Sequence, residues 1–499
     1  MSKSKQAAKS VSIIIIFAFA SKFLGFIRES LIAAKFGSGF ATDTFFIALS
    51  AISLFTTMIT KSINTTMIPV LAEIEKKEGK EGKISHTNNL LSIISLISLV
   101  LIALAWILSP AIIRILATGF EGKQFKLAVL MMKIGLPSIF FASIQGAFRG
   151  YLHSELMFTE SAATQLPFNF VYIFFLALLA NYFDIRALMV VSVLATFAQI
   201  SLQIPSLRKC GYRYRFGLDF RDKFVRKMIF LIPPVLISAT ISDLNSIVDK
   251  SMASNLDEGS ISALQYASRL RGIISSTFIS AIATVIYPML SDEANKENYN
   301  GLKKAIIHGM NIIMLITIPA TIGIIVLANP IVKVAFQRGK FDSTATYMTV
   351  GALIFYSVGM IASSMKTLVH RTYYSLQDTK TPMITNFIAL ILNIVFNFIL
   401  VKYMAHRGLA LATSISSVVT LFYLLYKLRE KIGHFGFNKS VKCGLKSLGA
   451  SVVMGIVVYF LDGTLASIMG SGSMLELVAL LLSAGVGVLI YFVIIYLFK

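Results

Sequence analysis

Residues 11–36 read VSIIIIFAFASKFLGFIRESLIAAKF, a long apolar stretch interrupted by only a few charges. A helix needs roughly 20 apolar residues to cross about 30 Å of hydrocarbon, so this stretch predicts a first membrane span. A similar stretch near 259–290 contains Arg269, as the first contains Arg28. A guanidinium near the bilayer centre costs about 3 to 17 kcal/mol. The sequence therefore predicts a polar cavity that gives both arginines water or an anion.

The composition extends this interpretation to the whole chain. Its 499 residues are 56% hydrophobic and 14% charged, with a mean hydropathy of +0.76, whereas a soluble protein carries roughly 25% charge. The basic start resembles a signal peptide, but the apolar run continues without a small-residue cleavage site, so we expect a retained first helix. We predict an all-α polytopic membrane protein with about fourteen transmembrane helices. They lie near 11–36, 41–73, 87–117, 126–151, 156–181, 186–207, 228–253, 259–290, 304–335, 344–370, 380–402, 408–427, 445–461 and 474–498.

The placement of basic residues predicts the orientation. Lys and Arg gather before residue 10 and at 76–83, 208–227, 296–304 and 427–446. Short loops on the cytoplasmic side are enriched in these residues, so we expect both termini in the cytoplasm. These loops also account for most of the net charge of +22. No nucleic-acid recognition module lies between the spans, which argues against nucleic acid as a partner.

An internal repeat appears at a shift of about 220 residues. Ile68-Pro69-Val70-Leu71-Ala72-Glu73 is echoed by Tyr287-Pro288-Met289-Leu290-Ser291-Asp292, and Ser109-Pro110 by Asn329-Pro330. The repeat predicts two pseudo-symmetric six-helix bundles, 1–225 and 226–432, followed by an additional helix pair at 433–499. Secondary transporters place a central site between such repeats, which move against each other.

Six motifs, spread over nearly the whole chain, carry a resemblance to a known family. They are SKFLGFIRE at 21–29, FG at 36–37, ATDTFF at 41–46, YASRL at 266–270, FQRGKF at 336–341 and YSLQDTKTP at 374–382. With them the chain resembles the MurJ/MviN family of lipid II flippases, within the superfamily of multidrug, oligosaccharidyl-lipid and polysaccharide exporters. The resemblance implies transport of lipid II, an undecaprenyl-pyrophosphate-linked disaccharide-pentapeptide, from the inner to the outer leaflet of the bacterial cytoplasmic membrane. It also implies alternating access through a cationic central cavity, without ATP.

A lipid-borne pyrophosphate calls for donors that stay charged at low dielectric, and guanidinium adds a bidentate fork. We therefore predict that Arg28 and Arg269, one from each half, bind the substrate. The resemblance adds Lys22, where the family has a basic residue. Glu29 shares a helical stripe with Lys22 and is expected to hold the cations when no substrate is present. The alternative is an internal ion-pair network that only joins helices.

The second span departs from the family pattern. Many relatives have an arginine about fourteen residues before the proline that matches Pro69, whereas this chain has Thr56-Thr57. Lys61 lies one turn further on and is our candidate to supply the missing charge to the substrate site. It is equally well explained as a surface lysine whose amine reaches toward water.

The resemblance also implies a sodium site, formed by Asp249, Asn393, Asn397, the backbone of Leu409, and Thr413. Hard oxygen ligands of this kind suit a small cation, here Na+ as a coupling ion. Some relatives have an aspartate where this chain has Asn397, which lowers the negative charge of the site. The alternative is that these amides and hydroxyls hydrogen-bond neighbouring helices.

Other features argue against an enzyme. The six histidines show no zinc-ligand spacing, and no nucleotide-binding glycine loop ends in Gly-Lys-Ser/Thr; no other cofactor is expected. Three other functions stay open: a flippase for another polyprenyl-linked glycan, a cation-coupled multidrug exporter, and a non-transporting scaffold. Membrane lipid, and cell-wall synthesis proteins that dock on the basic 208–227 loop, are candidate partners.

Overall fold

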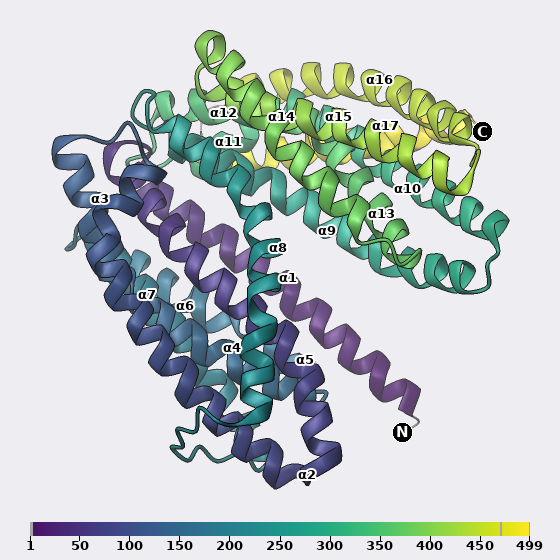
Figure 1. The fold of residues 1–499 in the computed structure, drawn as a ribbon. Coiled ribbons are helices and arrows are strands. Elements are labelled where there is room, and N and C mark those ends of the chain that lie inside the picture. The colour runs from purple at the N-terminus through teal and green to yellow at the C-terminus, as the bar shows by residue number, and fades with distance from the viewer. Residues whose placement is uncertain (1–2, 470–471, 499) are drawn as a thin grey trace. The chain divides into compact units, whose positions relative to one another are not determined.

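The computed structural model describes residues 3–469 and 472–498, and in this part of the chain it contains helices and no strands. Side chains at 3–12, 14–15, 231–243 and at single positions elsewhere are outside this description. Figure 1 shows the helices, whose bounds are α1 Lys3–Phe36, α2 Phe40–Leu116, α3 Gly122–Gly135, α4 Ser138–Ser154, α5 Phe158–Ala163, α6 Gln165–Leu178, α7 Ile185–Lys209, α8 Lys223–Ala253, α9 Ser260–Asn295, α10 Tyr299–Val326, α11 Ala328–Phe336, α12 Ser343–Val358, α13 Met360–Ser375, α14 Lys380–Met404, α15 His406–Ile432, α16 Phe437–Met469 and α17 Ser473–Leu497.

Each of the fourteen predicted apolar stretches falls on one helix or on two consecutive helices. Within the described residues, nine helices are long and apolar enough to cross a membrane, or ten if the bent pair α12 and α13 forms one span. Helix α2 counts once there although it contains two predicted stretches, 41–73 and 87–117. The all-α polytopic architecture is confirmed.

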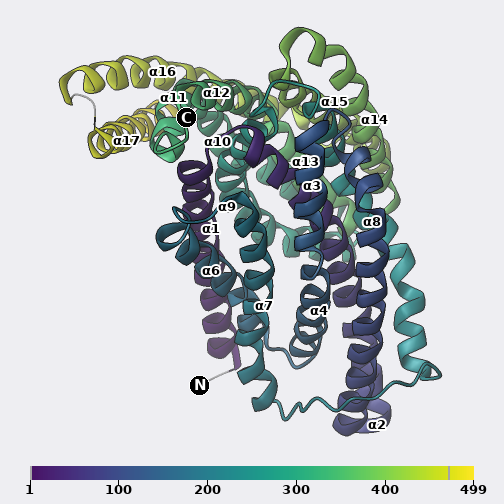
Figure 2. The ribbon, with the colours of Figure 1, turned by 90° about the vertical axis from the view of Figure 1, so that its left-hand side faces the viewer.

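The chain divides into two compact units, Met1–Glu258 and Gly259–Lys499. Helix α8 belongs to the first unit, where it packs along α2 (Figure 2). Lys250 Nζ donates to Ser50 Oγ at 2.7 Å, and Gly119 N–H donates to Ser254 Oγ at 3.0 Å. The two units are defined by packing, whereas the predicted halves 1–225 and 226–432 come from a sequence repeat. The units therefore do not test the halves, which stay a prediction.

The first unit is organised by a break in α2 at Gly79, whose φ of 72° is easily adopted only by glycine. The break brings residues eight apart together: Lys83 Nζ lies 2.8 Å from Glu75 Oε2. In a straight helix those positions would be about 12 Å apart along the axis. Lys83 is fully buried, and its ammonium also contacts Glu155 Oε1 at 2.6 Å and the ring of Tyr151.

The second unit has its main apolar core between α9, α10, α13 and α15, with Ile306, Met310, Leu368 and Leu424 fully or almost fully buried. A smaller cluster joins α16 and α17 to the end of α10. There Tyr491 Oη donates to Leu315 O at 2.8 Å. The predicted additional helix pair therefore belongs to the second unit and packs against α10.

Candidate substrate and ion sites

Arg28 lies on α1 against α6, and its guanidinium is held from several sides. Nη2 lies 2.8 Å from Glu29 Oε1, and Nη1 donates to Asn169 Oδ1 at 3.1 Å. The Asn169 amide in turn donates to Ser21 O at 3.2 Å. The guanidinium carbon also lies 5.4 Å from the Phe168 ring centroid and 5.3 Å from that of Tyr172. These contacts fix the direction of the fork.

The Arg28 side chain is 14% exposed and that of Glu29 is 5% exposed. An arginine carries five N–H donors, and the contacts to Asn169 and Glu29 use its two terminal nitrogens. Donor capacity therefore remains for an anion. The pair with Glu29 is also what the ion-pair alternative predicts, so the geometry fits both interpretations.

Lys22 lies on the same helix, less than two turns before Arg28, and is half-buried. Lys61 lies on α2 and is exposed. Thr56, at the missing arginine position, and Thr60, one turn further on, donate their hydroxyls to carbonyls of their own helix. The exposure of Lys61 agrees with both predicted roles.

Arg269 belongs to the second unit, on α9, where its side chain is exposed. One turn earlier, Tyr266 is fully buried between Phe336 and Phe341, with ring centroids 4.9 and 5.6 Å away. The structure thus brings the YASRL and FQRGKF motifs together. This aromatic cluster anchors the first turns of α9 and sets where Arg269 emerges.

Four of the five predicted sodium-site residues lie together on α14 and α15. Asn397 Nδ2 donates to Asn393 Oδ1 at 3.1 Å, and Asn393 Nδ2 donates to Thr413 Oγ1 at 3.2 Å. The Thr413 hydroxyl donates to Leu409 O at 3.2 Å. The oxygens are of the type a sodium ion prefers, but the groups also satisfy one another, as the helix-packing alternative predicts.

Asp249, the fifth predicted ligand, lies on α8 in the first unit and is buried. Among the described residues no three His, Cys, Asp or Glu side chains gather as a metal site. The predicted site depends on amide and hydroxyl oxygens, so this finding does not test it.

Sequence reasoning missed Asn169, Phe168 and Tyr172, all on α6. A signal was present, because QLPFNFVYIFF at 165–175 places one asparagine among aromatic residues in an apolar run. A lone amide there needs a polar partner. Its link to Arg28, 141 residues away, is a tertiary contact that one sequence does not reveal.

The helical spans and the internal arginine define a polytopic membrane transporter. The family model for the lipid II flippase MurJ matches residues 32–480, and the chain belongs to this family. Within it the chain is a membrane transporter and not an enzyme.

Two curated relatives match almost end to end. A probable lipid II flippase MurJ from Vibrio cholerae is 28% identical over 508 residues, covering 99% of this chain and 96% of the relative. One from Rickettsia prowazekii is 27% identical over 501 residues, covering 98% and 97%.

Solved structures agree on the fold. A lipid II flippase MurJ in an inward closed conformation superposes with a TM-score of 0.80 at 26% identity, covering 97% of this chain and 98% of that one. An inward-facing multidrug resistance transporter of the MATE family gives a TM-score of 0.66 at 14% identity, covering 84% and 98%. The second likeness concerns the fold alone.

Proposed function

We propose that this protein moves lipid II from the inner to the outer leaflet of the bacterial cytoplasmic membrane, by alternating access through a cationic central cavity. The family match over residues 32–480 supports the substrate class. The observation that carries the chemistry is Arg28, held in a polar niche inside an apolar helix. An anion recognised there has to be presented by a lipid, since the helix lies among membrane spans.

Arg28 acts as a fork for the pyrophosphate. Asn169 and the faces of Phe168 and Tyr172 orient the guanidinium, while Glu29 balances its charge when substrate is absent. Two N–H groups of one guanidinium can then bind two phosphate oxygens in parallel. Three further cations add positive charge: Lys22, Arg269 and, in place of the missing arginine, Lys61.

Sodium is our proposal for a coupling ion. Asn393, Asn397, Thr413 and the carbonyl of Leu409 supply four neutral oxygens on adjacent helices. Asp249 would add the one negative charge. To bind an ion, the Asn393 amide oxygen has to turn away from the Asn397 amide that donates to it.

We place both termini in the cytoplasm, because the basic loops then share that side. The 208–227 segment, with eight Lys and Arg residues, is the largest of them.

The experiment is depletion of the protein in cells followed by measurement of lipid II accessibility. A lipid II-degrading toxin added outside cleaves only precursor that has reached the outer leaflet. We expect depletion to make lipid II accumulate and become protected from the toxin. If wall precursors turn over normally while another polyprenyl-linked glycan accumulates, or only drug sensitivity changes, the proposal is wrong.

A further inference from the structure

Residues 211–222, which we call the strap, connect α7 to α8 and read GYRYRFGLDFRD. The strap lacks regular helix or strand, and it runs along one end of the first unit (Figure 2). Its sequence alternates: Tyr214, Phe216, Leu218 and Phe220 fall on even positions, and Arg213, Arg215, Asp219 and Arg221 on odd ones. In an extended chain this alternation separates apolar and charged side chains onto opposite faces.

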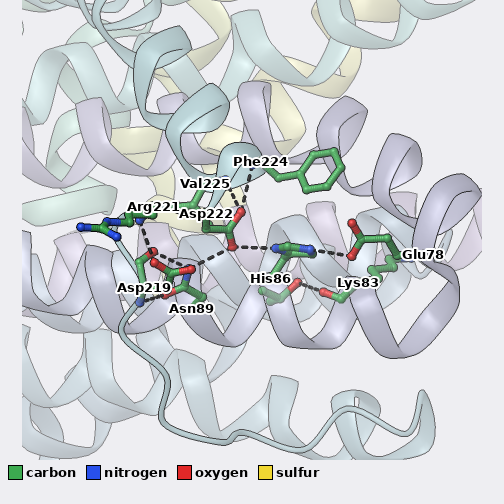
Figure 3. Close-up of polar contacts among 10 residues, drawn as sticks. Glu78, Lys83, His86, Asn89, Asp219, Arg221, Asp222, Phe224 and Val225 are labelled. Atoms are coloured by element: carbon green, nitrogen blue, oxygen red, sulfur yellow. Dashed lines mark hydrogen bonds and ion pairs between the residues drawn. The ribbon is translucent and has the colours of Figure 1, made fainter.

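The backbone of the strap is fixed to α2. Asn88 Nδ2 donates to Arg213 O at 3.1 Å. Asn89 makes a reciprocal pair with Asp219: its amide donates to the carbonyl at 2.8 Å, and its oxygen accepts from the N–H at 2.8 Å (Figure 3). Two asparagine side chains thus replace the strand partner that the extended segment lacks.

A histidine closes the end of the strap. His86 Nδ1 lies 2.6 Å from Asp222 Oδ2, and its Nε2 lies 2.8 Å from Glu78 Oε2 (Figure 3). Both ring nitrogens face carboxylates, a geometry in which the protonated ring donates to both of them. Asp222 also accepts the N–H groups of Phe224 and Val225 and so caps α8.

Two helices place the strap at the edge of the hydrocarbon layer. Helix α7 has 25 residues, or about 37 Å, somewhat more than the roughly 30 Å of bilayer core, and the strap follows it directly. On α2 the strap is held by Asn88 and Asn89, in the first turn of the predicted apolar stretch 87–117. Both attachments put the strap at the headgroup level.

The side chains of the strap are exposed in a pattern typical of that level. Tyr214 is 50% exposed, Phe216 77%, Leu218 44% and Phe220 53%. The basic residues beside them are also exposed: Arg213, Arg215, Arg221 and Lys223. Aromatic side chains favour the membrane–water interface, and Lys and Arg there attract anionic lipid.

A hollow of about 790 Å³ lies between the strap and α2. The strap contributes Arg213, Arg215 and Arg221 to its wall, and α2 contributes Glu78 and His86. Glu81, Asp219 and Asp222 line the hollow as well, so its acidic and basic residues are similar in number. An anionic group is therefore attracted by the exposed arginines of the strap rather than by the hollow as a whole.

We propose that the strap is a membrane-interface element that binds the headgroups of anionic phospholipids in the cytoplasmic leaflet. The arginines bind the headgroup phosphates, and the rings of Tyr214, Phe216 and Phe220 lie at the boundary between headgroups and acyl chains. Its position at the headgroup level favours lipid over a soluble acidic protein. The proposal is independent of what the transporter carries.

The test uses the full chain in nanodiscs with a single indole reporter. Trp106 is the one tryptophan of the sequence, so Trp106→Phe combined with Phe216→Trp places the only indole on the strap. Nanodiscs contain brominated phosphatidylglycerol or brominated phosphatidylcholine at equal mole fraction. We expect blue-shifted emission and stronger quenching by the brominated phosphatidylglycerol.

A second comparison neutralises three arginines of the strap and, as a control, three lysines of α16. Arg213→Gln/Arg215→Gln/Arg221→Gln should lower the enrichment of phosphatidylglycerol at the reporter by roughly tenfold. The matched control, Lys439→Gln/Lys442→Gln/Lys446→Gln on α16, removes the same charge and should leave the enrichment unchanged. If the triple arginine variant does not fold, Arg215→Gln alone is used, with an expected loss of roughly twofold.

Three outcomes would overturn the proposal. Emission typical of indole in water, without quenching by either lipid, would show that the strap faces the cytosol. Equal quenching by both lipids would remove the preference for anionic headgroups. An equal loss in the α16 control would show that net charge, rather than the strap, attracts the lipid.

Discussion

The Arg28 niche and the Asn393–Asn397–Thr413 cluster are both polar groups within apolar helices, but they differ in how many hydrogen-bond donors remain unused. In the niche, a permanent charge meets one carboxylate, one amide and two ring faces, and donor capacity is left over. In the cluster, neutral amides and hydroxyls form a chain in which each donor has an acceptor. An arginine whose donors are only partly used indicates a ligand more strongly than amides and hydroxyls that already donate to one another.

The largest effect is expected for Arg28→Ala. Loss of a desolvated bidentate contact costs about 3 kcal/mol or more, which corresponds to roughly 100-fold. We expect loss of complementation and of toxin-accessible lipid II, with the protein still inserted. Arg186→Ala, which removes an exposed arginine paired with Asp184, is the control and should behave as wild type. Near-normal growth of the Arg28 variant would remove the niche from the mechanism.

Arg269→Ala tests whether the second unit supplies an equivalent charge. We expect loss of complementation here too, because the proposed binding of the pyrophosphate uses this second cation. Lys340→Ala, in the FQRGKF motif that packs against α9, controls for local disturbance. Full transport by the Arg269 variant would leave Arg28 as a one-sided site.

Asn169→Ala should lower transport by roughly fivefold, because it removes one hydrogen bond worth about 1 kcal/mol and leaves the guanidinium charge in place. The apparent affinity for substrate should fall more than the maximal rate, since orientation rather than charge is lost. An unchanged affinity would mean that Asn169 only joins α1 to α6.

The cluster makes its own prediction through Asp249→Ala and Asn397→Asp. If sodium binds, the first change should impair cycling and abolish its sodium dependence, whereas the second should strengthen sodium binding by adding a charge. Transport assayed in vesicles at varied sodium concentration distinguishes them. A response to sodium that neither variant alters would assign the cluster to helix packing alone.

The smallest effect is expected from deprotonation of His86, which contacts Asp222 and Glu78. His86 lies between the predicted spans 41–73 and 87–117. Burial opposes its charged form, but hydrogen bonds to Asp222 and Glu78 outweigh this and raise the pKa of His86 above 6.5. A raised pKa means that the stabilisation is complete below pH 6.5 and is lost as the pH rises through the folded-state pKa. Amide exchange at Phe224 and Val225, corrected for intrinsic rates, should therefore quicken by a few fold at alkaline pH.

His86→Gln should remove most of that pH dependence, because a neutral amide has no proton to lose in this range. Exchange at Phe224 and Val225 that shows the same pH profile in both proteins would assign the change to another group.

Most of the fold follows from the sequence, because long apolar stretches have one stable form in lipid. The sequence did not show that α2 stays helical through 74–86 apart from the break at Gly79, since that segment is stabilised by contacts across the break, such as Lys83 with Glu75. The sequence singles out Arg28 as a candidate because a charge inside an apolar helix is costly. It does not single out Asn169, because the contact with Arg28 depends on which helix lies opposite.

The burial of the Lys83 ammonium has a practical use. An amine-directed reagent applied to the intact protein should spare this lysine, while lysines at the surface react. The appearance of its adduct would then register the moment at which the two arms of α2 separate, with no engineered probe in the chain.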